Sequence, residues 1–433
     1  MALSVIKKLC ILSISLALAL TADAQDMHAG QASISGRILN VYSSPYPAKV
    51  WVFQILIHDG FATMLPSCVT DTDLEGKFEC SKLPDGKFIV EVLPSRRSKS
   101  QKQKAPDSEG EAIPASIFYP GVTDIEDAMP IFLHANEAGW DDIRVAYAPT
   151  VEVTGELTDH VPPASFKLEA LSEDGLVLDT GIQPTYDRRT GRFSISNVPA
   201  GHYQLTANWL TSRDIGHATL PFAVGVNPVD RLLLSSMLDV EITGRLSALP
   251  AGVTVSQVTL ASTDGSIRDL SAPVKDGTFN FRSVPVGTYT LSFPSSQQVY
   301  VDAISVGGNS FSGSRFTVSP GQRTLNLELV VKGPSIPLQG SVKKWDGEDK
   351  SAEVIAQSEE SGQIYKVTTD GQRRFSFPGV KPGTYRMFAW PGVDAIEYRN
   401  PVALRKYKDD SAEVSVEQDG LISTIELTPI EIK

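Results

Sequence analysis

A histidine and a glutamate with the spacing of a zinc-peptidase pair occur once in the sequence. His134 and Glu137 form His-x-x-Glu, but a peptidase of this kind also needs a distant histidine on a large α/β scaffold. The chain has six histidines, so one chance match is expected. The pair also falls between a strand-like run and a turn. No catalytic zinc and no other metal cofactor are predicted.

A cluster of acidic residues further upstream resembles the beginning of a calcium loop. Its acidic residues are Asp71, Asp73 and Glu75, and Gly76 follows them as the glycine of the loop pattern. The pattern requires a bidentate acid at its twelfth position, where this sequence has Lys82. A hairpin turn explains the same residues, because aspartate side chains bond to nearby backbone groups. The turn is the preferred interpretation and calcium binding the alternative.

Signatures of nucleophilic or nucleotide-dependent catalysis are missing from the sequence. No serine lies in a Gly-x-Ser-x-Gly elbow, and no phosphate-binding loop is present. Gly307, Gly308 and Gly313 bracket a loop or hairpin, without the strand-to-helix setting of a dinucleotide site. The sequence therefore predicts no catalytic residues and no cofactor.

Aromatic residues in the last quarter of the chain are the best candidates for a binding surface. Strand alternation directs one set of residues inward, namely Tyr385, Met387 and Ala389. The other face then carries Arg386, Phe388 and Trp390. An exposed Phe–Trp pair beside an arginine could stack on sugar rings. The favoured alternative is that residues 391–410 fold back and cover these rings.

Two cysteines, Cys68 and Cys80, remain after the export signal described below. They flank a segment that reads as a strand, a turn and a strand. If the turn is centred near Leu74, the cysteines lie opposite one another. Export makes oxidation feasible. A disulfide is therefore expected, with two buried free thiols as the alternative.

The N-terminus is typical of an export signal. Lys7 and Lys8 precede an apolar run over 9–20, which is too short to cross a bilayer as a helix, and cleavage is expected after Ala24. Cys10 lies at the beginning of the run, the wrong place for a lipid anchor. No later run reaches about 18 apolar residues. The mature chain is expected in the periplasm, outside the cell or on its surface, without membrane insertion.

The formal net charge of the chain is −12, and loss of the signal leaves about −13. A polyanion of this kind disfavours nucleic acid and anionic lipid as partners. The same charge also keeps an exported protein soluble, which is the simpler explanation. The expected partner is a polysaccharide or another component of the cell envelope.

An internal repeat dominates the organisation of the chain. Each copy has an aliphatic residue, a proline, a glycine, any residue and an aromatic residue. The copies lie at 83–88, 198–203, 284–289 and 380–385, and the fourth moves its proline one place. A second mark, a glycine within a strand-like run, recurs upstream at Gly36, Gly155, Gly244 and Gly340. Units of about 90–120 residues have the size of whole domains rather than of solenoid repeats.

The segments between these marks read as short strands. Residues after each repeated glycine alternate between apolar and polar, which indicates half-buried strands. Helical periodicity is nearly absent. One short helix is expected within 400–407, because Asn400 can cap it and Pro401 can take its first position. Many short strands with turns between them predict β-sandwiches.

Domain boundaries follow from the spacing of the repeat. A signal peptide is expected at 1–24, and four sandwiches at 25–148, 149–238, 239–332 and 333–433. Residues 95–112 are polar and highly charged, with no apolar anchor. They are expected to form a mobile loop within the first domain.

Each unit resembles the carboxypeptidase regulatory-like domain, a sandwich of the transthyretin-like and starch-binding-like type. The matching pattern is a strand containing glycine, a polar turn such as 70–78, and then the Leu-Pro-Asp-Gly segment at 83–86. Segments 118–123 and 388–390 are also similar to tandem exported bacterial proteins of this kind. Members include spacers, adhesion-associated modules and carbohydrate binders, so the resemblance implies a fold and leaves the ligand open.

The expected fold is all-β, a tandem array of immunoglobulin-like or transthyretin-like β-sandwiches. The expected function is that of a non-catalytic binding or structural module at the cell envelope, with carbohydrate as the ligand class. A pure spacer and a metal-dependent hydrolase are the alternatives. Exposed rings at Phe388 and Trp390 would favour binding, whereas buried rings would weaken it.

Overall fold

The computed structural model describes most of the chain from Ala32 onward. The described residues are 32–95, 112–145, 147–158, 163–173, 175–210, 215–235, 237–247, 249–265, 267–294, 298–333, 335–346, 351–392, 394, 396–417 and 425–432. The expected signal peptide, and all but the end residues of the expected loop at 95–112, lie outside them. Among the described residues, no helix is long and apolar enough to cross a membrane.

The first two repeated units each fold as a pair of sheets. In the first, β4-β1-β9 packs on β3-β2-β5-β7, with β8 also beside β5. Its elements are β1 (Ala32–Leu39), β2 (Ala48–His58), β3 (Phe61–Asp71), β4 (Lys77–Leu83), β5 (Gly86–Pro94), β6 (Ala112–Pro114), β7 (Ile117–Phe118), the 3-10 helix η1 (Ile125–Asp127), β8 (Ile131–Leu133) and β9 (Ala138–Arg144).

In the second domain, β13-β14-β10-β17 packs on β12-β11-β15-β16-β18. Its strands are β10 (Tyr147–Leu157), β11 (Ser165–Leu171), β12 (Val177–Asp179), β13 (Thr185–Tyr186), β14 (Arg192–Pro199), β15 (Gly201–Leu210), β16 (Ile215–Val224), β17 (Val229–Leu234) and β18 (Met237–Leu238).

The third and fourth units follow the same plan. In the third, β22-β19-β27-β24-β25 packs on β21-β20-β23-β26. Its strands are β19 (Val240–Ser247), β20 (Gln257–Ser262), β21 (Leu270–Pro273), β22 (Thr278–Val284), β23 (Gly287–Ser292), β24 (Tyr300–Val306), β25 (Asn309–Ser312), β26 (Arg315–Val318) and β27 (Thr324–Lys332). In the fourth, β31-β28-β34 packs on β30-β29-β32-β33. Its elements are β28 (Ile336–Val342), β29 (Ala352–Ser358), β30 (Ile364–Thr368), β31 (Arg374–Val380), β32 (Gly383–Pro391), α1 (Pro401–Arg405), η3 (Lys408–Asp410), β33 (Ala412–Val416) and β34 (Ile425–Leu427).

One topology recurs in all four domains. The first strand pairs antiparallel with one neighbour and parallel with the last strand of the same sheet, as β1 does with β4 and β9. The same arrangement holds around β10, β19 and β28. Each pair of sheets encloses its own apolar core. The predicted all-β class of tandem β-sandwiches is confirmed.

Strand β10 runs across the boundary expected at 148. Its residues Tyr147 to Pro149 pair with β6, and from Thr150 onward it pairs with β14. The first and second domains are therefore joined by a continuous strand and not by a separate linker.

The repeated Pro-x-Gly segment is a corner at which the chain passes from one sheet to the other. It connects β4 to β5, and the equivalent strands in each later domain. Glycine suits this corner because φ is positive at Gly86, Gly201 and Gly383. In three domains the following tyrosine donates its hydroxyl hydrogen bond to the carbonyl four residues earlier, over 3.0, 2.8 and 2.6 Å, from Tyr203 to Pro199, Tyr289 to Pro285 and Tyr385 to Lys381. This bond closes the corner and explains the aromatic residue of the repeat.

The strand glycine of each repeat is required for packing. The strand glycines at Gly36, Gly155, Gly244 and Gly340 pair in register with Phe78, Phe193, Phe279 and Phe375. Each ring is at most 4% exposed. A Cβ on the last three of these glycines would overlap the paired phenylalanine ring. The glycine leaves the space that the ring fills.

The cysteines expected to bond, Cys68 and Cys80, are joined by a disulfide with a Cα–Cα distance of 5.9 Å. Cys68 lies in β3 and Cys80 in β4, which belong to different sheets. The disulfide therefore links the two sheets across the first core. The expected geometry, in which the cysteines face each other within one hairpin ladder, was wrong, because β3 pairs with β2 and β4 pairs with β1.

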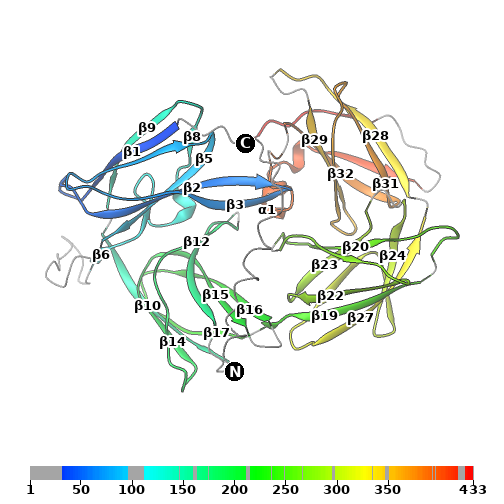
Figure 1. The fold of residues 1–433 in the computed structure, drawn as a ribbon, viewed down its shortest axis with the longest axis horizontal. Helices are drawn as coiled ribbons and strands as arrows, with labels where there is room; N and C mark the ends of the chain where they lie inside the picture. Colours follow the sequence, from blue (N-terminus) through cyan, green and yellow to red (C-terminus); the bar gives the residue numbers. More distant parts are fainter. Residues whose placement is uncertain are drawn as a thin grey trace, which may run out of the picture.

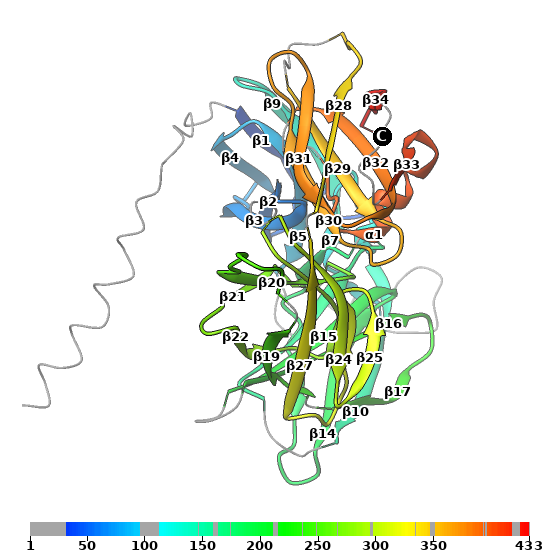
Figure 2. The ribbon, with the colours of Figure 1, turned by 90° about the vertical axis from the view of Figure 1, so that its right-hand side faces the viewer.

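The four sandwiches lie at the corners of a quadrilateral, in chain order around it (Figure 1). The view turned by 90° places the first and fourth domains together above the second and third (Figure 2). The first and second domains share an apolar cluster that includes Phe118 and Leu178. His217 of the second domain contacts Asp239, 3.1 Å away, at the start of the third. The hairpin of β2 and β3 reaches α1 of the fourth domain, which closes the ring of domains (Figure 1).

Candidate functional site: a charged junction of three domains

The aromatic pair expected to form a binding surface is buried. Phe388 and Trp390 do lie on the face of β32 opposite the core, as strand alternation predicts, because Tyr385, Met387 and Ala389 all belong to the core between the sheets. The two rings stack with centroids 5.3 Å apart and are 2% and 0% exposed.

The cover comes from the segment after β32, which includes α1. Tyr398, Leu404 and Tyr407 pack on the Phe388–Trp390 pair, and the Tyr407 ring meets Trp390 edge-on at 5.5 Å. Asn400 caps α1 by accepting a hydrogen bond from the Val402 amide at 2.9 Å. The predicted short helix is confirmed, and it belongs to the segment that covers the rings. The alternative of an exposed sugar-stacking surface at this position was wrong.

Arg386, the third residue of that predicted surface, is held by polar contacts. Its guanidinium donates to Glu359 Oε1 at 2.6 Å and to Ser411 Oγ at 3.1 Å. It therefore ties β32 to the segment that precedes β33. Exposed rings lie at other positions, among them Phe132 on β8 and Trp140 on β9 of the first domain, which are 64% and 60% exposed.

The two metal-like motifs are parts of turns. Glu137 accepts a hydrogen bond from the His134 amide at 2.9 Å. Asp73 Oδ1 accepts from the amides of Glu75 and Lys77, each at 2.8 Å. Among the described residues, no group of three or more His, Cys, Asp or Glu side chains is placed to hold a metal ion. Hydrogen bonding within each turn explains why these residue types occur there.

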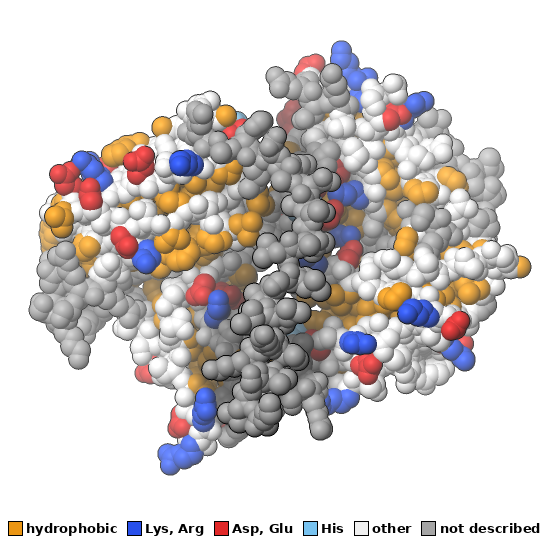
Figure 3. Space-filling view, in the orientation of Figure 1, with side chains coloured by type: hydrophobic (Ala, Val, Ile, Leu, Met, Phe, Trp, Pro, Cys, Tyr) orange, Lys and Arg blue, Asp and Glu red, His pale blue; other side chains and the backbone are white. Residues whose placement is uncertain are grey.

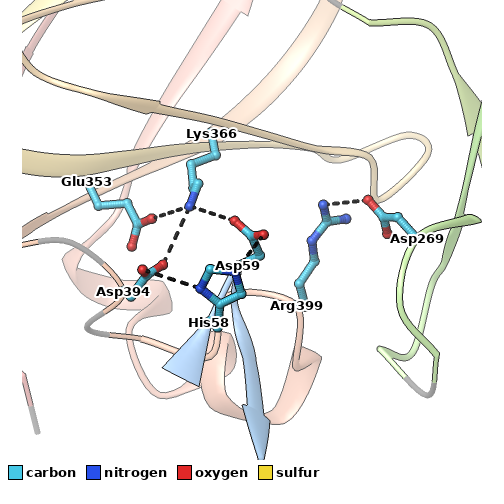
Figure 4. Close-up of polar contacts among 7 residues, drawn as sticks. All are labelled: His58, Asp59, Asp269, Glu353, Lys366, Asp394 and Arg399. Carbon is cyan, nitrogen blue, oxygen red and sulfur yellow. Dashed lines mark hydrogen bonds and ion pairs between the residues drawn. The ribbon is translucent and has the colours of Figure 1, made fainter. Parts of the chain in front are cut away.

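A dense cluster of ionisable side chains joins the first and fourth domains (Figure 4). At its centre, Lys366 Nζ on β30 lies 3.1 Å from Glu353 Oε1 and 3.6 Å from Asp394 Oδ1 in the same domain. It also lies 3.2 Å from Asp59 Oδ1, in the turn between β2 and β3. His58 Nδ1 is 3.8 Å from Asp394. One lysine thus contacts carboxylates of two domains.

Arg399 extends the cluster to the third domain. Its Nη2 lies 2.7 Å from Asp269 Oδ2, and its backbone amide donates to the Gly60 carbonyl at 3.1 Å. The guanidinium also lies 5.8 Å from the ring centroids of Phe61 and Tyr398. A single residue beside α1 therefore contacts both the first and the third domain. We call the seven ionisable residues drawn in Figure 4 the junction: His58, Asp59, Asp269, Glu353, Lys366, Asp394 and Arg399.

Burial and pairing act in opposite directions on the junction residues. Burial raises the pKa of Glu353, whose side chain is 0% exposed, and that of Asp269. The hydrogen bond from Lys366 lowers the pKa of Asp59. Burial alone would lower the pKa of Lys366, but its contacts with Glu353, Tyr398 and Asp59 outweigh that effect and raise it. A lysine shared among several carboxylates offsets the desolvation cost that a single buried pair would carry.

The junction is better suited to holding domains than to catalysis. A glutamate with a raised pKa is a common general acid, but the buried carboxyl of Glu353 offers no surface to a substrate. On the fourth-domain side of the centre of this face, Lys, Arg, Asp and Glu side chains lie close together (Figure 3). The chemistry that the arrangement supports is ion pairing across domain interfaces.

Sequence reasoning missed the junction. Lys366 and Asp59 are 307 positions apart, and neither belongs to a recognised motif. The available signals were local: Asp59-Gly60 as a hairpin turn, and Arg399 directly before the expected helix. Neither signal indicates which domain the residue will contact.

The fourth domain matches a known family model. Residues 333–410 match polysaccharide lyase family 4, domain II, a fibronectin type III-like model. The match supports a β-sandwich and does not support the carboxypeptidase regulatory-like family specifically. It covers a minority of the chain. No curated protein matches the chain.

Solved structures with similar chains include pilus proteins. The Bacillus anthracis TIE protein is 13% identical, with 89% of this chain and 68% of that chain covered and a TM-score of 0.17. A streptococcal ancillary pilin is 12% identical, with 69% and 99% covered and a TM-score of 0.22. The RrgB pilus protein of Streptococcus pneumoniae is 10% identical, with 83% and 91% covered and a TM-score of 0.18. Likeness at this level carries no information about function.

Proposed function

We propose that this protein is a non-catalytic structural and binding module of the cell envelope, with carbohydrate as its ligand class. The observation that carries the proposal is the junction, at which Lys366 and Arg399 of the fourth domain contact the first and third domains. A closed ring of sandwiches is a stable platform for presenting a surface. An enzyme would instead need an open cleft with converging acids and histidines.

The carbohydrate class rests on three further points. The matched family model is named for a domain of a polysaccharide lyase. The net charge of −12 disfavours nucleic acid and anionic lipid. The exposed rings of Phe132 and Trp140 have apolar faces of the kind on which sugar rings stack.

The test uses the mature protein, residues 25–433, on an array of envelope and storage polysaccharides. We expect retention by at least one polysaccharide and no change in polymer length. Trp140→Ala measures the contribution of the exposed ring, and the buried Trp390→Ala serves as a folding comparison. Release of new chain ends would show an enzyme and overturn the proposal. Failure to bind any glycan would reject the carbohydrate ligand and leave a pure spacer as the function.

A further inference from the structure

The third domain carries an open groove on the outer face of its five-stranded sheet. The groove encloses about 890 Å³. Its floor is formed by outward residues of three adjacent strands, Asn280 on β22, Thr243 on β19 and Asn326 on β27. One wall is the β21–β22 turn with Lys275, and the other is the Gly307–Gly308 turn.

Hydrogen bonds within the sheet hold the polar side chains of the floor in place. Thr243 Oγ1 donates to Asn326 Oδ1 at 2.5 Å, and Asn280 Nδ2 donates to Glu241 Oε1 at 2.7 Å. Each amide keeps further donor or acceptor capacity for a ligand. Phe279, the aromatic residue at the groove, is 4% exposed. Recognition here must therefore use hydrogen bonds and charge instead of ring stacking.

The charge of the groove is opposite to that of the chain. Its lining holds the cations Arg245, Lys275 and Arg282 and the anion Glu328, whereas the chain as a whole carries −12. Arg245 pairs with Glu328 at 3.1 Å. Lys275 and Arg282 are exposed and have no ion-pair partner among the described residues.

The second domain supplies a natural comparison at the same position of the fold. Its groove encloses about 900 Å³ around Gly155, the counterpart of Gly244. There the lining holds two cations and two anions, Arg192, Arg231, Glu156 and Asp187. The two grooves share size and sheet position but differ in charge, so excess positive charge is specific to the third domain within this pair.

We infer that the groove of the third domain binds a segment of an anionic polysaccharide, a chain bearing uronate carboxylates. Lys275 and Arg282 would pair with carboxylates, and the amide and hydroxyl groups of the floor would bond to sugar hydroxyls. This inference rests on the proposed function and narrows its ligand class.

The test compares two matched double variants in affinity electrophoresis with polygalacturonate. Lys275→Gln/Arg282→Gln removes two charges from the third domain, and Arg192→Gln/Arg231→Gln removes two from the second. We expect about tenfold or greater weakening for the first variant and less than about twofold for the second. Methyl-esterified polygalacturonate should bind weakly to the natural protein and to both double variants. All four side chains are exposed, so melting temperatures should not change.

The outcomes separate this inference from the proposed function. Equal weakening by both double variants would show that net charge alone drives retention, and it would overturn the inference. Equal binding of the methyl-esterified polymer would do the same. Binding of neutral glycans only would reject the groove as an anion site but leave the proposed function intact. Absence of binding to every glycan would reject the carbohydrate class itself.

Discussion

The strand glycines show how a single absent side chain shapes a sandwich. Gly340 lies between β31 and β34, and a Cβ there would overlap both the Phe375 ring and the Ile425 carbonyl. Replacing Gly340 with alanine should destabilise the fourth domain by about 1–3 kcal/mol, the usual cost of overpacking a core. Gly371→Ala in the same domain is the control, because no atom lies within 4 Å of its Cβ position. Calorimetry that gave equal losses for both variants would contradict this account.

Glu91 provides a pH dependence that can be traced to one carboxyl group. It is 1% exposed and accepts a hydrogen bond from Ser116 at 2.9 Å. Burial raises its pKa to about 8, from 4.5, with a smaller contribution from the charge of Asp179 in the second domain. The folded protein therefore keeps a proton that the unfolded chain loses between about pH 4.5 and pH 8. Stability should fall as pH rises through that window, by up to about 1.4 kcal/mol per pH unit.

Urea unfolding at pH 5 and pH 8.5 measures this effect. Glu91→Gln keeps an acceptor for Ser116 but cannot ionise, so its stability should depend less on pH than that of the natural protein. Parallel pH profiles for the two proteins would mean that Glu91 does not titrate as described.

At the residue scale, the sequence predicted on which face of the strand the aromatic side chains of the fourth domain lie. It did not predict whether that face is exposed. Alternation along a strand is a local property, and it placed Phe388 and Trp390 on the face opposite the core. Whether another segment covers that face depends on packing of residues 391–410, for which the pattern allowed two outcomes. Local periodicity cannot choose between them.

At the scale of elements, the features predicted correctly were those determined by a few residues adjacent in the sequence. The Pro-x-Gly corner and the capped helix α1 depend on backbone conformations that proline, glycine and asparagine favour locally. Strand partners depend on contacts between distant segments. The disulfide illustrates the difference, because the partner of Cys68 was expected but its bridge between two sheets was not.

The disulfide should stabilise the first domain by closing a short loop in the unfolded chain. Cys68 and Cys80 are 12 positions apart, and loops of about this length contribute roughly 3 kcal/mol in the chain-entropy model. Cys68→Ser/Cys80→Ser should lower the melting transition of the first domain. The same shift should appear when the natural protein is reduced with dithiothreitol, and reduction should not affect the double variant. A reductant effect on the variant would point to a cause other than this disulfide.

At the scale of the whole molecule, the closed ring could not be predicted from the sequence. The repeat specifies four similar sandwiches, but nothing in it states the angle between neighbours. The angle between the first and fourth domains follows from a few contacts at the β2–β3 hairpin tip, such as the pairing of Asp59 with Lys366 on β30 and the hydrogen bond from the Arg399 amide to Gly60. Each such contact is small, so the ring depends on several of them acting together. The ring can therefore be tested at one tip without disturbing any core.

Gly60, at the tip of the β2–β3 hairpin, is the position for that test. Its φ is +77°, and a Cβ there would press against the Tyr398 ring of the fourth domain. Gly60→Ala should separate the first and fourth domains and increase the radius of gyration in small-angle X-ray scattering. Gly252→Ala is the matched control, because Gly252 has the same φ of +77° but no atom within 4 Å of its Cβ position. Both variants carry the same backbone strain, so a larger radius for Gly60→Ala alone isolates the contact with Tyr398.

Raising the salt concentration should open the Gly60→Ala ring further, because the remaining junction contacts are partly exposed ion pairs that salt screens. An unchanged radius for Gly60→Ala at both low and high salt would mean that the hairpin tip does not hold the ring closed.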